Sequence, residues 1–173
     1  MSPVLAAASL DLGTPISRTP YDVYLGPMYA VLQHLGSGQP PLPVVEQLVR
    51  EGRSFRYIYK TEQPYVPQTP EVTETTKAGD CKAKSLWLAS KMDTRKVRFV
   101  IGKAKLQSNM SHAWIIWESP EGWLILDATN YSRPLAPDRL SPAEFIPTFS
   151  YSSSGRFAHT VSGAARGAKD GDH

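Results

Sequence analysis

The sequence contains a single cysteine, Cys81, in a setting that would suit a nucleophile. It follows a Gly-Asp pair and precedes an apolar run in the stretch "TTKAGDCKAKSLWLASKM". If a helix starts here, Asp80 is a good N-cap residue and Cys81 lies in the first turn. The helix dipole and the free backbone N–H groups there favour a thiolate. Taken alone, however, Cys81 is better explained by packing, because free cysteines are among the residues most often buried.

Cysteine catalysis also needs a base and a group that orients the base. Of the four histidines, His112 differs from the others because it opens the run "HAWIIWE". This run has apolar residues on both faces, as a central strand would. The next predicted strand, "WLILDAT", contains Asp127, where an unpaired carboxylate would be costly.

The register of these two strands decides whether the histidine and the aspartate meet. If Glu118 faces Trp123, His112 and Asp127 become diagonal neighbours on one face, within reach of a hydrogen bond. A slip of one residue would place them on opposite faces. Each has an ordinary explanation, a core histidine and a strand-end aspartate helped by Asn130. Together with Cys81, in this order, they are much less expected by chance.

The remaining pattern predicts an α+β fold with an antiparallel sheet, because helices come first and hairpin-linked strands follow. We expect helices over 27–36, 43–52 and 80–92, with one helical turn after Pro70. We expect strands over 55–60, 96–101, 111–119 and 122–129. The buried face of the third helix is predicted to contain Cys81, Ser85, Leu88, Ala89 and Met92.

Length and composition favour one folded domain. The chain has 173 residues, of which 41% are hydrophobic and 20% charged. Residues 1–20 are predicted to form an irregular N-terminal arm, 21–160 a single domain, and 161–173, which are small, polar and glycine-rich, a disordered tail.

Net charge and cysteine content bear on the binding partners and the cellular compartment of the protein. The net charge is only +3, so we expect no nucleic-acid partner. We expect an ordinary solvated face for the basic cluster Lys91, Arg95, Lys96, Arg98, Lys103 and Lys105. One cysteine cannot form an internal disulfide, which suits a reducing compartment, and a cytoplasmic location is expected. No signal peptide is expected, since no Lys or Arg precedes Arg18. No membrane association is expected, since no apolar run approaches the ~20 residues of a membrane span.

Two segments, "QTPEVTETTKAGDCKAKSLWLASKM" and "SHAWIIWESPEGWLILDATN", resemble the transglutaminase-like superfamily, and especially the bacterial transglutaminase-like cysteine peptidases. The resemblance covers roughly residues 54 to 131 and rests on Thr69-Pro70, Gly79-Asp80-Cys81, His112-Ala113 and Leu126-Asp127. It implies a papain-like α+β core, with the nucleophile at a helix N-terminus packed on an antiparallel sheet. It also implies a triad with Cys81 as nucleophile, His112 as base and then acid, and Asp127 as the residue that orients the histidine.

The implied reaction is acyl transfer through a thioester, with a protein or peptide amide as donor and water or an amine as acceptor. Neither a cofactor nor a metal is implied. A catalytically inactive transglutaminase-like interaction module is the alternative, and the sequence indicates no oligomeric state.

The chain departs from the family pattern at two places. Relatives often carry acidic residues after the cysteine, whereas this chain has Lys82, Ala83 and Lys84, a basic flank that would favour an acidic substrate. Many relatives have a tryptophan where this chain has Pro67, which leaves Gln68 or Tyr65 as the candidate side-chain donor to an oxyanion.

Overall fold

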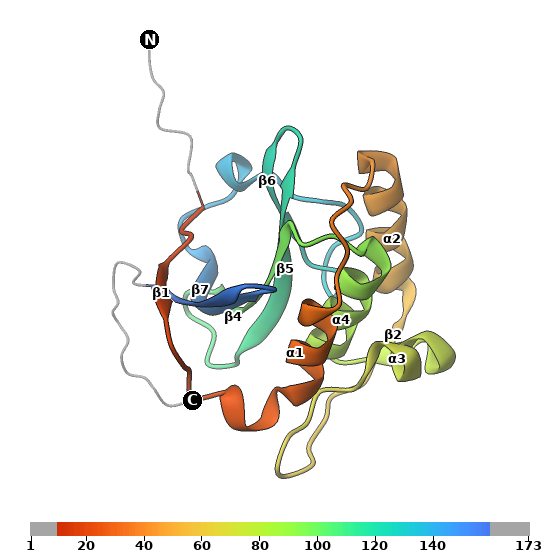
Figure 1. The fold of residues 1–173 in the computed structure, drawn as a ribbon, viewed down its shortest axis with the longest axis vertical. Coiled ribbons are helices and arrows are strands. Elements are labelled where there is room, and N and C mark those ends of the chain that lie inside the picture. Colours follow the sequence, from red (N-terminus) through yellow and green to blue (C-terminus); the bar gives the residue numbers. More distant parts are fainter. Residues whose placement is uncertain (1–9, 160–173) are drawn as a thin grey trace.

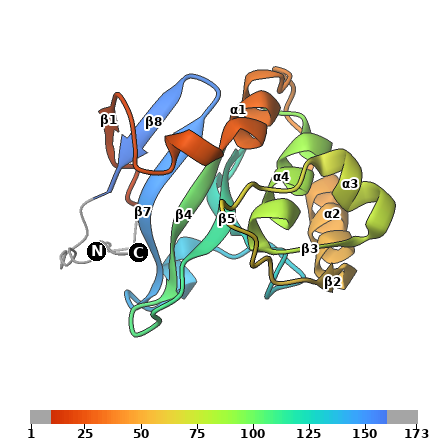
Figure 2. The same ribbon diagram turned by 90° about the horizontal axis from the view of Figure 1, so that it is seen from below.

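Four helices pack on one side of a six-stranded antiparallel sheet in the computed structural model, which describes residues 10–159 (Figure 1; Figure 2). The predicted tail 161–173 lies outside these residues. The helices are α1 (Gly26–Gln33), α2 (Leu42–Ser54), α3 (Pro70–Thr76) and α4 (Cys81–Met92). This arrangement confirms the predicted α+β class. None of the helices among residues 10–159 has the length and apolar character needed to cross a membrane.

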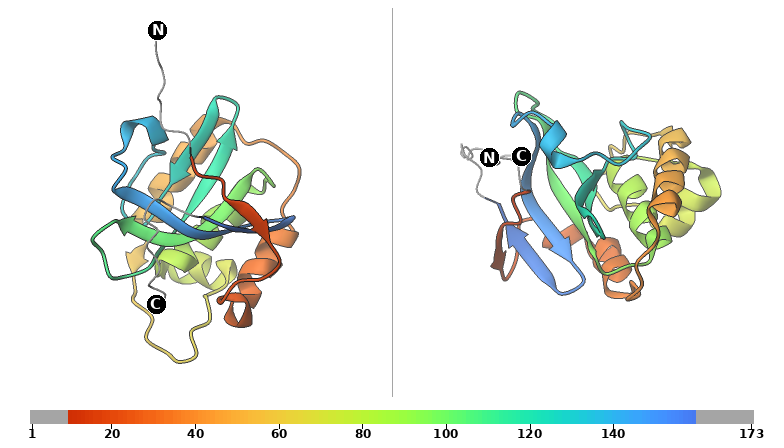
Figure 3. Two further views of the ribbon diagram at one scale, coloured as in Figure 1. Left: turned by 90° about the vertical axis from the view of Figure 1, so that its left-hand side faces the viewer. Right: turned by 90° about the horizontal axis from the view of Figure 1, so that it is seen from above.

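The strands of the main sheet run in the order β1-β8-β7-β4-β5-β6 (Figure 3). Their bounds are β1 Thr14–Ile16, β4 Val97–Lys105, β5 His112–Ser119, β6 Gly122–Leu126, β7 Glu144–Ser152 and β8 Gly155–Ala158. A separate parallel pair is formed by β2 (Arg56–Tyr57) and β3 (Ala78–Gly79). Two short 3-10 helices, η2 (Asp22–Tyr24) and η3 (Pro137–Arg139), complete the elements.

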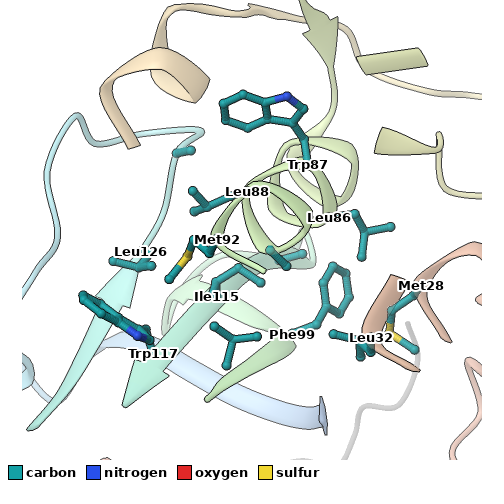
Figure 4. Close-up of a cluster of buried hydrophobic side chains, with 14 of the residues drawn as sticks. Met28, Leu32, Leu86, Trp87, Leu88, Met92, Phe99, Ile115, Trp117 and Leu126 are labelled. Atoms are coloured by element: carbon teal, nitrogen blue, oxygen red, sulfur yellow. The ribbon is translucent and has the colours of Figure 1, made fainter. Parts of the chain in front are cut away.

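The α4 helix is the centre of the core rather than a surface helix with one buried stripe. The five residues of the predicted stripe are buried, but so are Ala83, Leu86 and Trp87 on its other sides. Figure 4 shows Leu86, Leu88 and Met92 of α4 with side chains of the sheet and of α1 around them. The apolar surroundings on most sides fix the position and direction of α4, and therefore of Cys81 at its start.

The β5 strand is buried on both faces, as its sequence predicted. Ala113, Ile115 and Trp117 belong to the cluster that contains α4. Trp114 and Ile116 belong to a second cluster with Val100, Ile125, Leu135 and Phe145. The strand on which His112 lies is therefore held between two cores.

The β5–β6 hairpin has the register that the sequence predicted. Glu118 pairs with Trp123, and Ile115 pairs with Leu126. On the other side of β5, His112 pairs with Gly102 of β4, where a bulge shifts the register between β4 and β7. A Cβ atom at Gly102 would lie 2.1 Å from the Ile146 carbonyl oxygen, so this bulge requires glycine.

Part of the stretch predicted as an irregular arm is a strand. Thr14–Ile16 forms β1 and pairs with β8 near the other end of the described chain. Arg98 helps to hold this segment, since its Nη1 donates to the Leu12 carbonyl at 2.6 Å and its guanidinium stacks on Phe157. Arg98 is therefore half-buried and structural, and does not belong to the solvated basic face that we expected.

Candidate active site

Cys81 is the first residue of α4, and Asp80 caps the helix as predicted. The Asp80 Oδ1 atom accepts a hydrogen bond of 2.8 Å from the Ala83 backbone N–H, while its own backbone lies in the extended region. Cys81 is 7% exposed. Within residues 10–159, no protein acceptor engages the backbone N–H groups of Cys81 and Lys82. The thiol therefore lies at the positive end of a helix, beside two donors that have no intrahelical partner.

His112 and Asp127 meet at the end of the β5–β6 hairpin. The His112 Nε2 atom lies 2.9 Å from Asp127 Oδ2, in a buried position. His112 opens β5, and Asp127 follows the last residue of β6. Because the hairpin register is the one that the sequence predicted, the diagonal approach of these side chains follows from it.

The Asp127 carboxylate is held by three donors. Besides His112, it accepts a bond from the Thr129 backbone N–H at 3.1 Å and one from Asn130 Nδ2 at 3.3 Å. Asp127 is 1% exposed, so these bonds replace the water that a buried carboxylate loses. The strand-end turn with Asn130 and the contact with His112 were alternative explanations of Asp127 from sequence, and the structure contains both.

Cys81 interacts with the same histidine. Burial alone would lower the pKa of His112, but hydrogen bonding with Asp127 and with Cys81, together with their negative charges, raises it to about 10. Because Asp127 engages Nε2, Nδ1 is the ring nitrogen available for a second hydrogen bond. The structure thus joins His112 and Asp127 by a hydrogen bond and places Cys81 close enough to the ring to raise its pKa.

Gln68 and Tyr65, the candidate oxyanion donors, lie near the start of α4 but have other partners. The Gln68 Nε2 atom donates to Thr73 Oγ1 at 2.9 Å and to the Ala78 carbonyl at 2.8 Å. The Tyr65 hydroxyl donates to Asp80 Oδ2 at 2.6 Å. Both amide protons of Gln68 and the hydroxyl proton of Tyr65 are engaged in these bonds, so neither side chain has a free donor. An oxyanion role for either stays a prediction.

Gly79 is required by internal packing. A Cβ atom at this position would lie 2.7 Å from Ala83 Cβ and 3.3 Å from Gln68 Nε2. The glycine therefore lets β3 and the segment around Gln68 approach the first turn of α4. Its neighbour across the β2–β3 pair is Tyr57, a residue that the sequence did not single out. Tyr57 is 46% exposed, and the partial loss of solvent around it, with the nearby charges of Cys81 and Asp80, raises its pKa to about 12.

The two lysines after the cysteine have different environments. Lys82 is partly exposed, and its Nζ lies 5.1 Å from the centre of the Tyr65 ring. Lys84 is 1% exposed and lies in the core. The sequence predicted that both would make the surface around Cys81 basic, and this is wrong for Lys84, because α4 is buried on nearly all sides.

Comparison with known proteins places the fold. No protein-family model matches the chain, and neither does any curated protein. Among solved structures, calcium-bound LapG of Legionella pneumophila superposes with a TM-score of 0.54 at 19% identity, covering 79% of this chain and 82% of LapG. The EGTA-treated form gives 0.53 at 21% identity, covering 75% and 72%. The chain therefore has the papain/transglutaminase-like fold, as the motifs predicted.

The calcium ion belongs to that LapG structure. In the part of this chain that the structure describes, no group of three or more His, Cys, Asp or Glu side chains gathers in a way that would hold a metal ion. The candidate site is instead defined by the hydrogen bond between His112 and Asp127, with Cys81 close enough to the ring to raise its pKa.

Proposed function

We propose that this protein is a cysteine peptidase that cleaves a peptide or protein amide through a thioester on Cys81. The observation that carries the proposal is the position of His112, which is hydrogen-bonded to Asp127 at 2.9 Å and interacts with the thiol at the start of α4. A thiol, a base and a group that orients the base are the three parts that cysteine catalysis requires.

In the proposed mechanism, His112 is the imidazolium in the resting enzyme, and the sulfur of Cys81 attacks as a thiolate. The raised pKa of His112, about 10, keeps the ring protonated at neutral pH while Asp127 accepts the hydrogen bond from Nε2. A thiolate is far more nucleophilic than a thiol and needs no further proton transfer before it attacks.

In the acylation step, the Cys81 sulfur attacks the carbonyl carbon of the substrate amide. A carbon–sulfur bond forms, and the carbonyl π electrons move to oxygen. His112 then gives its proton to the amide nitrogen, the carbon–nitrogen bond breaks, and the amine leaves. The enzyme now carries a thioester, and His112 is a neutral base.

The developing oxyanion needs donors that are already in place. The backbone N–H groups of Cys81 and Lys82 have no acceptor within residues 10–159, and both lie at the positive end of α4. We assign the backbone N–H of Cys81 as the primary donor to the oxyanion. Tyr65 and Gln68 would take part only if they exchanged their present partners for the substrate.

In the deacylation step, His112 removes a proton from the acceptor as it attacks the thioester, and the thiolate leaves. Water as acceptor gives hydrolysis, whereas a primary amine gives transamidation. We propose hydrolysis of a protein or peptide as the main reaction, and a cytoplasmic location remains part of the proposal.

The experiment pairs thiol labelling with substrate cleavage. Iodoacetamide should label Cys81 rapidly at pH 7, and Cys81→Ala should abolish both labelling and the cleavage of a peptide library followed by mass spectrometry. A fluorescent primary amine added to the same library separates transamidation from hydrolysis. Labelling as slow as that of a buried, unactivated thiol, with no turnover, would favour the inactive interaction module.

A further inference from the structure

A lysine is buried one helical turn beyond the proposed nucleophile. Lys84 is three residues after Cys81 on α4 and is 1% exposed. Residues three apart on a helix lie on neighbouring turns of one face. Lysine is almost never fully buried unless its ammonium group has partners, because taking the charge out of water is costly. The position therefore calls for a physical explanation beyond packing.

One partner of Lys84 is the end of α2. Its Nζ donates a hydrogen bond of 2.7 Å to the Phe55 carbonyl. Phe55 is the residue that follows the last turn of α2, where the negative end of the helix dipole favours a cation. This bond uses one of the three ammonium protons and fixes the direction of the side chain.

The segment that follows Asp127 meets α2 and α4 at the same place. A Cβ atom at Gly52 of α2 would lie 3.0 Å from Ala128 Cβ and 3.2 Å from the Trp87 ring. The rings of Trp87 and Phe55 are 4.7 Å apart in an edge-to-face contact. Lys84 thus lies where the α2 end, the middle of α4 and the chain just after Asp127 converge.

Two charged groups act on Lys84 from the surrounding elements. Burial, the largest effect, lowers the pKa of Lys84, and the charge of Arg53 on α2 acts in the same direction. The charge of Asp127 opposes them and favours the ammonium form. Lys84 and Asp127 are each 1% exposed, so their charges act on one another in a buried region where screening by salt is weak.

The charge balance of the site gives this interaction a role. With Cys81 as thiolate, His112 as imidazolium and Asp127 as carboxylate, the triad carries one net negative charge in a buried position. We propose that Lys84 is a positioning residue that supplies the missing positive charge, so that Asp127 and the thiolate–imidazolium pair remain ionised together. This role rests on the proposed function, and it acts on the triad through Asp127 rather than through the substrate.

The test measures the pH dependence of Cys81 labelling by iodoacetamide in four variants. Lys84→Met removes the charge and the hydrogen bond, Lys84→Gln removes the charge but keeps a donor, and Lys84→Arg keeps the charge. Lys82→Met is the matched control, since it removes a partly exposed charge from the same turn of α4. Circular dichroism and thermal unfolding confirm that each variant is folded.

Loss of the Lys84 charge disfavours the neighbouring anions. The acid limb of the labelling profile should therefore move to higher pH by on the order of one unit in Lys84→Met and Lys84→Gln, so that labelling slows about tenfold below that limb. The profile of Lys84→Arg should stay close to that of the wild type. At high salt the shift should persist in the Lys84 variants and vanish in Lys82→Met, because only the exposed charge is screened.

A second arm tests whether the effect passes through Asp127. In an Asp127→Asn background, adding Lys84→Gln should move the profile by much less than it does in the wild type. A folded Lys84→Gln with an unchanged profile would overturn the proposal, as would an equal shift in both backgrounds. The proposed function is judged separately by peptide cleavage in Cys81→Ala, and labelling reports on the thiol even if no peptide is cleaved.

Discussion

The Tyr65 hydroxyl donates a hydrogen bond of 2.6 Å to Asp80 Oδ2, while Asp80 Oδ1 accepts the Ala83 N–H that begins α4. One carboxylate thus connects the loop before α3 with the cap of the helix on which Cys81 lies. Burial raises the pKa of Tyr65, and the charge of Asp80 raises it further, so the hydroxyl remains a donor throughout the physiological pH range.

Tyr65→Phe should lower stability more than it lowers catalysis. A hydrogen bond to a charged acceptor contributes about 1.5 to 3 kcal/mol, and we expect a loss of that size in the free energy of unfolding. Urea denaturation measures the change, with Tyr59→Phe as control, because Tyr59 is 62% exposed. If Tyr65 instead donates to the oxyanion, peptide cleavage by the folded variant would fall by about 10²-fold or more.

Asp127→Asn should remove most of the activity and leave the fold intact. An asparagine at this position cannot balance the imidazolium charge, and its amide would donate where His112 Nε2 requires an acceptor. We expect a fall in kcat of about 10³ to 10⁴, as for other triads that lose the orienting carboxylate. Asp138→Asn is the control, since its carboxylate has no hydrogen bond to His112. Cleavage at near wild-type rate in folded Asp127→Asn would contradict the triad.

The raised pKa of His112 predicts a loss of stability at alkaline pH. The ring has a pKa of 6.5 when unperturbed and about 10 in the folded protein, so between these values the folded state binds more protons than the unfolded state. The His112 contribution to the free energy of unfolding is complete below pH 6.5 and is lost as the pH rises through about 10. One proton limits the slope to about 1.4 kcal/mol per pH unit.

The measurement is urea denaturation of the wild type and of His112→Gln across this pH window. The wild type should lose stability more steeply with rising pH than the variant, because glutamine does not titrate. Parallel stability curves would show that His112 is not protonated in the folded protein at neutral pH.

The sequence predicted the helix start and the hairpin because their signals are local. Asp80 precedes an apolar run, and the pattern of β5 and β6 leaves one simple register, which was enough to bring His112 and Asp127 together. The pairing of β1 with β8 joins segments near opposite ends of the described chain, and no local pattern indicates such a contact. For want of such a local signal, the sequence predicted Thr14–Ile16 to be irregular.

The environment of Lys84 was beyond sequence reasoning for a related reason. Its burial depends on α2 and on the turn after Asp127, which close over α4 only in the tertiary structure. From sequence, a lysine after the nucleophile is most simply a surface charge. The partners of Gln68 and Tyr65 were hidden in the same way, because they lie on segments that the fold brings together at the start of α4.

Gly102 should be the glycine of the sheet that is most sensitive to substitution. It pairs with His112 at the bulge between β4 and β7, where an added Cβ would lie 2.1 Å from the Ile146 carbonyl oxygen and 2.8 Å from Pro147 Cα. Both are backbone atoms, so the strands must separate to admit a methyl group. We expect Gly102→Ala to lower the free energy of unfolding by about 1 to 3 kcal/mol. Gly38→Ala is the control, since its Cβ would meet nothing within 4 Å.

Because the strand that moves faces His112, Gly102→Ala should also slow Cys81 labelling at neutral pH, whereas Gly38→Ala should not. Equal stabilities of the two variants in urea would show that the bulge accommodates a side chain.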